Sequence, residues 1–264
     1  MLIGRSGEQA KLREAILARR SILVCGPADS GKTALLEETL ATLPSKVREN
    51  CLVCKAHGPP RQIWQSLAHR LAELHDGEVI SRMQRETGSS TSFDRWLRGQ
   101  TSLRLRGILR RAMRSHSYWV FLEAATRLPE GVYRLLQEWV WSRRTPVILL
   151  ARGSTEREVG KAARLFWHKG LQLHLGPIRT EDLEILLENA VERFAISKFA
   201  DAEFRDFALK QSAGLPGKML RLCELASQSA YQFGGRVKLH TLAVDFLLQE
   251  KQASCAIART THHG

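Results

Sequence analysis

The chain has 264 residues, of which 44% are hydrophobic, enough for one large domain or two smaller ones around a buried core. Its 40 lysines and arginines against 27 acidic residues give a formal net charge of +13, so the surface would attract nucleic acid, anionic lipid or an acidic protein. No run approaches the 18 or so apolar residues that cross a bilayer, and no apolar leader opens the chain, so we expect no membrane span and a cytoplasmic protein.

A glycine-rich loop follows an amphipathic helix predicted to end near residue 18 and a short apolar strand predicted at residues 22–25. The loop has the pattern Gly-x4-Gly-Lys-Thr and runs directly into an apolar helical pattern. Backbone N–H groups that converge at a helix N-terminus suit a polyphosphate, because the helix dipole favours anions. We therefore predict an ATP site in which Lys32 reaches the β- and γ-phosphates and Thr33 ligates Mg²⁺, with a glycine-rich surface turn as the alternative. The residues predicted to line the nucleotide here are Gly26, Pro27, Ala28, Asp29, Ser30, Gly31, Lys32, Thr33 and Ala34.

The segment Ile3-Gly4-Arg5-x-x-Glu8, which precedes the loop, resembles the opening of AAA+ ATPases of the origin-recognition type and of the related signalling ATPases called STAND proteins. In those families this segment packs over the adenine ring. The resemblance therefore implies that Ile3, Gly4 and Arg5 belong to the base pocket. An ordinary helix entry would explain the same residues without a ligand.

A second buried strand is predicted at residues 51–55, and a helix at 61–74. Cys51 and Cys54 have the spacing of a metal-binding pair, but residues three apart on a strand point to opposite faces, and the sequence has no second pair. We interpret both as buried thiols in a protein without a disulfide framework. The polar stretch 76–94 is predicted to be a loop or short helix with little packing.

Seven arginines and no acidic residue lie between residues 95 and 116. Apolar residues at 103, 108, 109 and 113 indicate one helix that packs by one face and has a basic outer face. The segment Arg95–Arg114 is therefore a candidate contact for the DNA backbone or an acidic partner. A solvated face is the alternative.

The run from Tyr118 to Pro129 is the second chemical motif, and it begins with a strand predicted at 118–122. It resembles the hydrophobic strand and Asp-Glu-Ala-x-Arg-Leu sequence that AAA+ proteins use as their Walker B element. In that family the Asp supports the Mg²⁺ shell and the Glu polarises the attacking water. Glu123 and Ala124 stand at these two positions. The resemblance thus implies Lys32 and Glu123 as catalytic residues and Thr33 and Glu123 as the Mg²⁺ residues.

Ala124 cannot polarise water, and this departure from the family pattern affects catalysis. General-base positioning is worth roughly a hundred- to ten-thousandfold in rate, so we expect tight ATP·Mg binding with hydrolysis that is slow or absent. Glu130 is a substitute carboxylate, but spacing alone does not place it at the γ-phosphate. Whether the chain is an ATPase enzyme therefore stays open.

A helix at 131–141, a strand at 146–151, a helix at 156–169 and a strand at 171–175 are predicted next. Arg152 and Ser154 follow the strand end where AAA+ proteins carry a γ-phosphate sensor, so the resemblance makes them candidates for it. Arg164, with Arg157 as the second choice, has the position of the arginine finger that this family presents to a neighbouring subunit's nucleotide. A surface salt bridge is the alternative.

A composition break at residues 176–177 marks the predicted domain boundary, and helices are predicted after it at 180–194, 201–212, 217–231 and 239–250. The sequence from Gly214 to Lys218 resembles the Gly-x-Pro-Arg sensor in the helical lid of the family. Gly217 stands at the arginine position. Pro216 and Lys218 thus become candidate nucleotide contacts, with Arg221 as a further candidate for the phosphates.

The resulting fold class is α/β: a P-loop three-layer sandwich with a five-stranded parallel sheet, plus a C-terminal α-helical lid. We expect residues 1–176 to form the AAA+ nucleotide-binding core, 177–250 the helical lid and 251–264 a disordered tail.

The expected function is a nucleotide-dependent switch of conformation or assembly that uses ATP and Mg²⁺, with DNA, other copies of the chain or a protein partner as candidates for what it acts on. Small AAA+ ATPases of transposition modules and secretion operons are similar in pattern and length. A STAND-like signalling module that switches a protein partner without DNA is the alternative. A small-molecule kinase is disfavoured, because no acceptor site is apparent.

Overall fold

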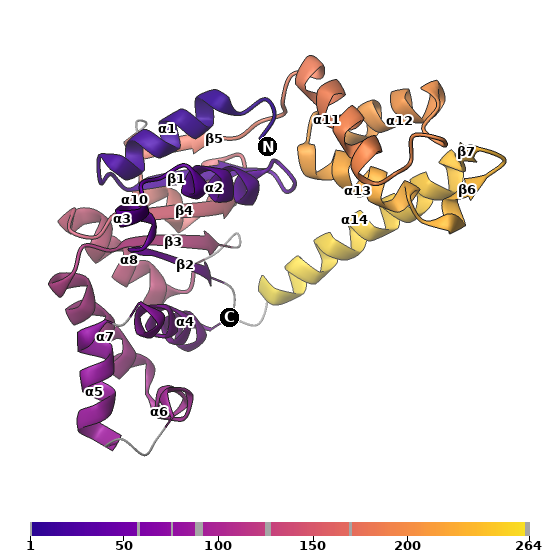
Figure 1. The fold of residues 1–264 in the computed structure, drawn as a ribbon. Helices are drawn as coiled ribbons and strands as arrows, with labels where there is room; N and C mark the ends of the chain where they lie inside the picture. Colours follow the sequence, from indigo (N-terminus) through magenta and orange to yellow (C-terminus); the bar gives the residue numbers. More distant parts are fainter. Residues whose placement is uncertain are drawn as a thin grey trace. The chain divides into compact units, whose positions relative to one another are not determined.

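The computed structural model of the protein describes residues 2–56, 59–74, 76–87, 92–124, 128–168 and 171–261 (Figure 1). The chain divides into two compact units. The sheet unit comprises residues 8–26 and 36–174, and the lid unit comprises residues 1–7, 27–35 and 175–264. The units differ from the predicted continuous segments, because the start of the chain and the glycine-rich loop pack with the lid helices.

Five strands form the sheet of the sheet unit: β1 (Ile22–Gly26), β2 (Cys51–Ala56), β3 (Trp119–Ala124), β4 (Val147–Arg152) and β5 (Gln172–His174). Their order is β2-β3-β4-β1-β5, and every neighbouring pair is parallel. The predicted α/β class with a five-stranded parallel sheet is confirmed. The first four strands are mainly apolar, as expected where helices cover both faces of a parallel sheet, and their charged residues stand at or next to the carboxyl ends.

One face of the sheet packs against a large helical core. Leu23, Leu52, Leu122 and Leu149 lie in it, one from each of four neighbouring strands. The helices that supply the rest are α4 (Pro60–Glu73), α5 (Gly77–Thr87), α6 (Phe93–Gly99), α7 (Ser102–Ser115), α8 (Glu130–Ser142), α9 (Glu156–Val159) and α10 (Lys161–Leu165). Figure 1 shows α5, α6 and α7 gathered beyond α4.

Helix α1 (Ser6–Leu17) covers the opposite face of the sheet. Side chains alternate between faces along a strand, so Trp119 and Phe121 point away from the core that holds Leu122. The indole N–H of Trp119 donates to the carbonyl of Ile16 at 3.0 Å, which fixes the end of α1 on this face. The loop and α2 (Lys32–Ala41), followed by α3 (Ser45–Arg48), connect β1 to β2.

The stretch 76–94 was predicted to be a loop or short helix with little packing, and the structure has a helix there that packs closely. Residues 77–87 form α5, in which Val79 is fully buried. Asp76 begins the helix, because its buried carboxylate accepts the N–H groups of Glu78 and Val79 at 3.0 and 3.1 Å and the hydroxyl of Tyr118 at 2.7 Å. The prediction was wrong because these contacts depend on residues distant in the sequence.

Two predicted helices are each broken in the structure. The segment 95–116 contains the end of α6 and all of α7, separated where Gln100 is extended and Thr101 caps α7 by accepting the N–H of Arg104. The segment 156–169 contains α9 and α10, which meet at Gly160 with φ of 68°. A positive φ favours glycine and interrupts helical geometry.

The lid unit contains α11 (Thr180–Arg193), α12 (Ala202–Ser212), α13 (Pro216–Ala226), a 3-10 turn (Ser229–Tyr231), the hairpin β6 (Gln232–Phe233) and β7 (Arg236–Val237), and α14 (Leu239–Thr261). These elements share a separate core that includes Leu187, Phe204, Leu222 and Phe246. The predicted helix 217–231 therefore ends at Ala226, and the hairpin follows it. No helix among the described residues is long and apolar enough to cross a membrane.

Helix α14 extends past the predicted start of a disordered tail at residue 251. It continues to Thr261, whereas residues 262–264 lie outside the described part of the chain. Alanines at 253, 256 and 258 favour the helix, and no glycine or proline interrupts residues 251–261.

Helix α7 provides a test of the packing, because its leucines include both buried and exposed positions. Leu109 is fully buried, and Leu103 is 79% exposed. We expect Leu109→Ala to lower the free energy of unfolding by about 2–5 kcal/mol. The same change at Leu103 should cost less than about 0.5 kcal/mol. Urea denaturation of both variants measures the difference, and equal losses would contradict one-sided packing of α7.

Candidate functional site

The glycine-rich loop leaves the sheet at the carboxyl end of β1, a buried strand with β4 and β5 as its neighbours. After β1 the chain continues at β2, on one edge of the sheet, whereas the connection from β4 crosses β1 to reach β5 on the other edge. The two connections therefore run in opposite directions from neighbouring strands. Ligands of open α/β sheets bind outside the carboxyl ends of the strands at such a switch point. The sequence thus places the loop where this fold class binds its ligands.

Two residues of the loop have left-handed backbone conformations. Asp29 has φ of 62° and Gly31 has φ of 86°. Glycine adopts this conformation without a steric penalty, and aspartate is one of the few other residues that tolerate it. Helix α2 begins directly afterwards, where the N–H of Leu35 donates to the carbonyl of Gly31 at 2.9 Å. The N-terminal end of α2 attracts anions through its unsatisfied N–H groups and its dipole.

Lys32 lies folded over the loop. Its ammonium donates to the carbonyl of Pro27 at 2.6 Å and to the hydroxyl of Ser30 at 3.1 Å. Thr33 is exposed, so its hydroxyl is accessible to a metal ion. A cation, a hydroxyl and helix N–H groups fit a nucleoside triphosphate with Mg²⁺, the ligand predicted for this loop.

Arg5 connects the start of the chain to the loop and to the lid. It is 3% exposed, and its guanidinium donates to the carbonyl of Ser30 at 3.2 Å and to the carbonyl of Gly176. Gly4 has φ of 70°, and a Cβ there would lie 2.9 Å from the Cβ of Asp182 in α11. The predicted base-pocket residues Ile3, Gly4 and Arg5 therefore lie in the lid unit with the loop, where Arg5 holds main-chain carbonyls.

The first turn of α13 packs directly on the loop. The N–H of Gly217 donates to the carbonyl of Asp29 at 2.8 Å. A Cβ at position 217 would lie 2.7 Å from the Cβ of Asp29 and 2.9 Å from its Cα. Pro216 lies near Gly31, since its Cγ would be 4.0 Å from a Cβ placed there. The position where the family pattern has an arginine is therefore closed to any side chain by the backbone of the loop.

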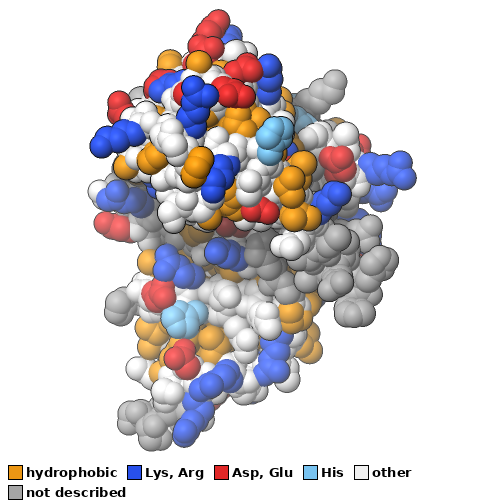
Figure 2. Space-filling model, turned by 90° about the vertical axis from the view of Figure 1, so that its right-hand side faces the viewer, with side chains coloured by type: hydrophobic (Ala, Val, Ile, Leu, Met, Phe, Trp, Pro, Cys, Tyr) orange, Lys and Arg blue, Asp and Glu red, His pale blue; other side chains and the backbone are white. Residues whose placement is uncertain are grey.

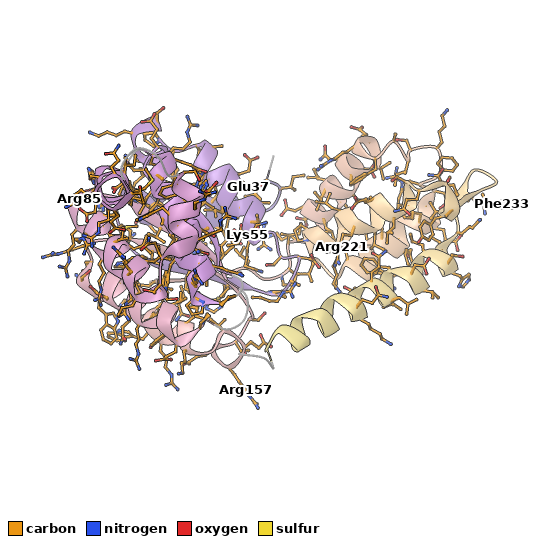
Figure 3. All side chains as sticks on the ribbon, turned by 90° about the horizontal axis from the view of Figure 1, so that it is seen from below. Glu37, Lys55, Arg85, Arg157, Arg221 and Phe233 are labelled. Carbon is orange, nitrogen blue, oxygen red and sulfur yellow. The ribbon has the colours of Figure 1, made fainter. Side chains whose placement is uncertain are left out.

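The two other basic candidates in α13 bind carboxylates. Arg221, labelled in Figure 3, pairs with the carboxylate of Asp29 and lies 3.8 Å from that of Glu250. The ammonium of Lys218 lies 2.6 Å from Glu250. Asp29 is thus held by the lid through both its main chain and its side chain. Sequence reasoning did not find this contact, although the three-residue spacing of Lys218 and Arg221 on one helix face was a signal for shared partners.

Glu123 belongs to the sheet unit, whereas Lys32 and Thr33 belong to the lid unit. It lies on β3, paired in register with Lys55 of β2 and Leu150 of β4. Alternation along the strand places it on the same face as Phe121. Ala124 ends the strand. Residues 125–127 of the predicted Walker B run lie outside the described residues.

The candidate sensor residues follow β4 in the sheet unit. Gly153 donates its N–H to the carbonyl of Gly26 at 3.0 Å, which joins this turn to the end of β1. Thr155 and Glu158 form a capping box at the start of α9, and the Glu158 carboxylate also accepts the N–H of Ser154 at 2.6 Å. Ser154 therefore has a local structural role through its main chain. Arg152 is half-buried at the end of β4.

The two candidate arginine fingers are both exposed to solvent. Figure 3 shows Arg157 projecting from the surface of the sheet unit. Neither Arg157 nor Arg164 forms an ion pair with a described residue. The surface salt bridge considered for them is thus not found within the described part of the chain.

The arginines of α7 are largely paired with carboxylates of neighbouring helices. Arg104 lies 2.5 Å from Glu86 and Arg111 lies 2.5 Å from Glu78, both on α5. Glu138 of α8 pairs with two more arginines, at positions 110 and 114. The predicted basic outer face is therefore partly neutralised by acids that the local sequence does not contain.

Cys51 and Cys54 are both buried, as interpreted from the sequence. Burial raises the pKa of the Cys51 thiol to about 12 and that of the Cys54 thiol to about 11, so both stay protonated near neutral pH. A metal-binding cysteine would be a thiolate. Among the described residues, no group of three or more potential ligands could hold a metal ion.

Comparison with known families gives one match, to the AAA ATPase domain over residues 1–151. No curated protein matches the sequence. Among solved structures, the chain is similar to the Aeropyrum pernix ORC1 protein in complex with DNA, with a TM-score of 0.66. The two sequences are 14% identical, and the match covers 93% of this chain and 66% of the ORC1 chain. The chain therefore spans slightly less than two thirds of that protein.

Two further structures share the fold. One is the Walker-type ATPase PABY2304 of Pyrococcus abyssi, with a TM-score of 0.59 and 14% identity over 98% of this chain and 76% of that one. The other is Cdc6p from Pyrobaculum aerophilum, with a TM-score of 0.57 and 9% identity over 88% of this chain and 63% of that one. The predicted likeness to origin-recognition-type ATPases is confirmed at the level of the fold.

The contact between Gly217 and Asp29 gives a direct test of the loop packing. We expect Gly217→Ala to destabilise the lid unit by about 1–3 kcal/mol, because the new Cβ overlaps the main chain of Asp29. Gly176→Ala is the control, since a Cβ there meets no atom within 4 Å, and it should change stability by less than about 1 kcal/mol. Denaturation and hydrogen exchange of the α13 amides measure both effects, and unchanged protection in the Gly217 variant would disprove the contact.

Proposed function

Because the chain belongs to the AAA ATPase domain family, we propose that it binds ATP with Mg²⁺ and uses the bound nucleotide as a switch of conformation or assembly. The observation that carries the proposal is the packing of the phosphate loop with the lid helices in one unit. A ligand shifts a protein between two states only by its differential affinity for them. A triphosphate bound to this loop would contact the same segment that α13 contacts. The two states would therefore differ in their affinity for the triphosphate.

The residues of the loop have distinct tasks in the proposed complex. The backbone of residues 27–31 and the start of α2 cradle the phosphates, Lys32 pairs with their charge, and the Thr33 hydroxyl ligates Mg²⁺. Lys32 now donates to the carbonyl of Pro27, so binding exchanges this contact for phosphate oxygens. Asp29 transmits the change, since Gly217 and Arg221 hold it from the lid.

Slow hydrolysis is the second part of the proposal, and it depends on positions 123 and 124. Glu123 supports the Mg²⁺ shell, whereas Ala124 has no group that can activate water. Glu130 is a poor replacement, because it forms ion pairs with Lys161 and Arg134. These hydrogen-bonded cations hold the pKa of the Glu130 carboxyl below its ordinary value, which makes it a weaker base.

DNA is the first candidate for what the switch acts on. Residues 177–264 carry eleven acidic and eleven basic residues, so the whole formal charge of +13 lies in residues 1–176. The similar ORC1 structure is a complex with DNA. Within the segment Arg95–Arg114, Arg95 and Arg98 are exposed and form no ion pair with a described residue, so they support this contact better than the paired arginines of α7. Figure 2 shows basic side chains interspersed with acidic and hydrophobic ones on the face that it views.

A STAND-like module that switches a protein partner without DNA is the second candidate. The ion pairs of α7 favour it, because they remove part of the charge that DNA would meet. Under either candidate, Arg164 or Arg157 would complete a neighbouring subunit's nucleotide site only in a homo-oligomer.

Substitutions at three positions test nucleotide use. Lys32→Ala should weaken ATP·Mg binding by more than about tenfold, because hydrogen bonds to charged groups are worth about 1.5–3 kcal/mol. Ala124→Glu should raise turnover by about a hundredfold or more by restoring the general base. Glu130→Gln should leave the residual rate unchanged. Fluorescent-nucleotide titration and phosphate release measure these effects, and an unmutated protein that turns over several ATP per second would refute slow hydrolysis.

The salt dependence of DNA binding separates the two candidates. If DNA is the partner, the affinity should depend on ATP, and replacing both Arg95 and Arg98 with alanine should reduce the slope of log K against log salt by about 2. The matched pair, Arg104→Ala with Arg110→Ala, should change the slope less, since these side chains already bind carboxylates. DNA binding that is absent, or indifferent to ATP, would favour the protein-partner alternative.

A further inference from the structure

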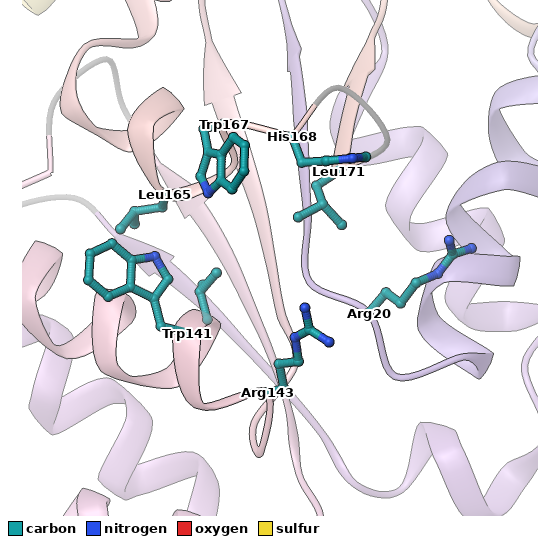
Figure 4. Close-up of a pocket in the computed structure, with 8 residues that line it drawn as sticks. Arg20, Trp141, Arg143, Leu165, Trp167, His168 and Leu171 are labelled. Atoms are coloured by element: carbon teal, nitrogen blue, oxygen red, sulfur yellow. The ribbon is translucent and has the colours of Figure 1, made fainter.

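A pocket of about 640 Å³ opens at the amino ends of the strands of the sheet unit (Figure 4). We call it the tryptophan pocket and define it by Arg20, Trp141, Arg143, Leu165, Trp167 and Leu171. Its residues flank the starts of β1, β4 and β5, whereas the phosphate loop follows the carboxyl end of β1. The pocket is therefore separate from the proposed nucleotide site.

Two tryptophans of the pocket are unusually open to solvent. Trp141, at the end of α8, is 61% exposed, and Trp167, between α10 and β5, is 76% exposed. Figure 4 shows the two indoles on one side of the pocket and the guanidinium groups of Arg20 and Arg143 on the other. Exposed aromatic groups beside an apolar depression are typical of interaction sites, where tryptophan and arginine contribute most of the binding energy.

The rim of the pocket is basic because the same short sequence precedes two neighbouring strands. Arg-Arg-Ser at 19–21 leads into β1, and Arg-Arg-Thr at 143–145 leads towards β4. Arg19 lies 4.3 Å above the ring of Trp119 and donates to the carbonyl of Arg144 at 3.2 Å, which holds the two segments together. Arg20 has one exposed acidic partner, Glu14 at 2.6 Å. Arg20 and Arg143 line the pocket at the amino ends of these two strands, and their charge favours an acidic partner.

A surface with the complementary properties lies on α11 of the lid unit. Glu181, Glu184, Ile185 and Glu188 follow the spacing of one helix face, and we call them the acidic face of α11. Ile185 is 50% exposed in the middle of this face. Glu181 and Glu184 form no ion pair with a described residue, and Glu188 pairs with Arg205. The acidic face thus combines uncompensated negative charge with an exposed apolar side chain.

We propose that the tryptophan pocket of one copy of the chain receives the acidic face of α11 from a second copy. Ile185 would enter the depression beside the indoles, and the glutamates would meet the arginines of the rim. Because two different surfaces join, the contact is head-to-tail and generates a ring or a filament instead of a closed symmetric dimer. The contact requires no nucleotide, so it goes beyond the proposed switch.

A second copy explains more of the structure than other occupants do. A nucleic acid would match the arginines and the indoles, but it leaves the acidic face of α11 without a role. An unrelated acidic peptide leaves the same face unexplained. Self-association uses both the basic pocket and the acidic face, and both surfaces are present on every copy at equal concentration.

A charge swap tests the proposal in the full-length chain. Sedimentation would measure self-association of the unmutated protein, Arg143→Glu, Glu184→Arg and Trp167→Ala, each with and without ATP. We expect each single change to weaken self-association by at least about tenfold, since a like-charge contact or a lost hot-spot tryptophan costs more than 1.4 kcal/mol. The double variant Arg143→Glu with Glu184→Arg should recover to within about threefold of the unmutated protein.

Matched controls separate this contact from misfolding and from failure of the nucleotide switch. Arg85→Glu, an exposed change on α5 labelled in Figure 3, should leave self-association unchanged. Every variant should keep its circular dichroism spectrum, and its affinity for ATP should equal that of the unmutated protein. If the unmutated protein does not bind ATP, the proposed function is wrong, but the charge-swap experiment still tests the contact between copies.

Three outcomes would overturn the proposal. The first is an unmutated protein that stays monomeric with and without ATP. The second is a double variant that does not recover. The third concerns quenching of tryptophan fluorescence by a poly-glutamate peptide or by single-stranded DNA. If Arg143→Glu abolishes this quenching but leaves self-association unchanged, the occupant of the pocket is a different molecule.

Discussion

Asp29 attaches the glycine-rich loop to the lid helices, and this attachment decides which segments form one unit. Its carbonyl accepts the N–H of Gly217, and its carboxylate pairs with Arg221. Arg5 adds a second connection, from the loop carbonyl of Ser30 to the carbonyl of Gly176. The glycine-rich loop is thereby joined at two points to other segments of the lid unit.

The family pattern and this chain differ where that attachment is made. An arginine at position 217 would have to occupy space that the main chain of Asp29 already fills. The two positions where this chain departs from the family pattern, 217 and 124, therefore have different surroundings. At position 217 the glycine makes a close backbone contact with Asp29, and Arg221 pairs with the carboxylate of the same residue. Position 124 is an alanine, and the nearby carboxylate of Glu130 is held in ion pairs with Arg134 and Lys161.

Local sequence was sufficient for the sheet and the loop. Strands buried on both faces are continuous apolar runs, and the glycine loop depends on residues adjacent in the chain. Contacts between distant segments could not be predicted in this way. Helix α5 depends on Asp76 and its hydrogen bond to Tyr118. The arginines of α7 pair with glutamates at 78, 86 and 138. Asp29 and its partner Arg221 are 192 positions apart in the sequence. The apolar spacing also predicted a single helix where the structure has α6 and α7. The boundary between them depends on the capping of α7 by Thr101, which apolar spacing does not indicate.

The lid unit is assembled from three separate pieces of the chain, and this limits how it can be altered. A fragment that begins at residue 177 would lack Arg5 and Asp29, and would expose Gly217 where it now receives the loop. The lid of a relative could not simply be transplanted into this chain. Substitutions at positions 29, 217 and 221 should not be additive in stability, because these residues share one contact although the polypeptide separates them.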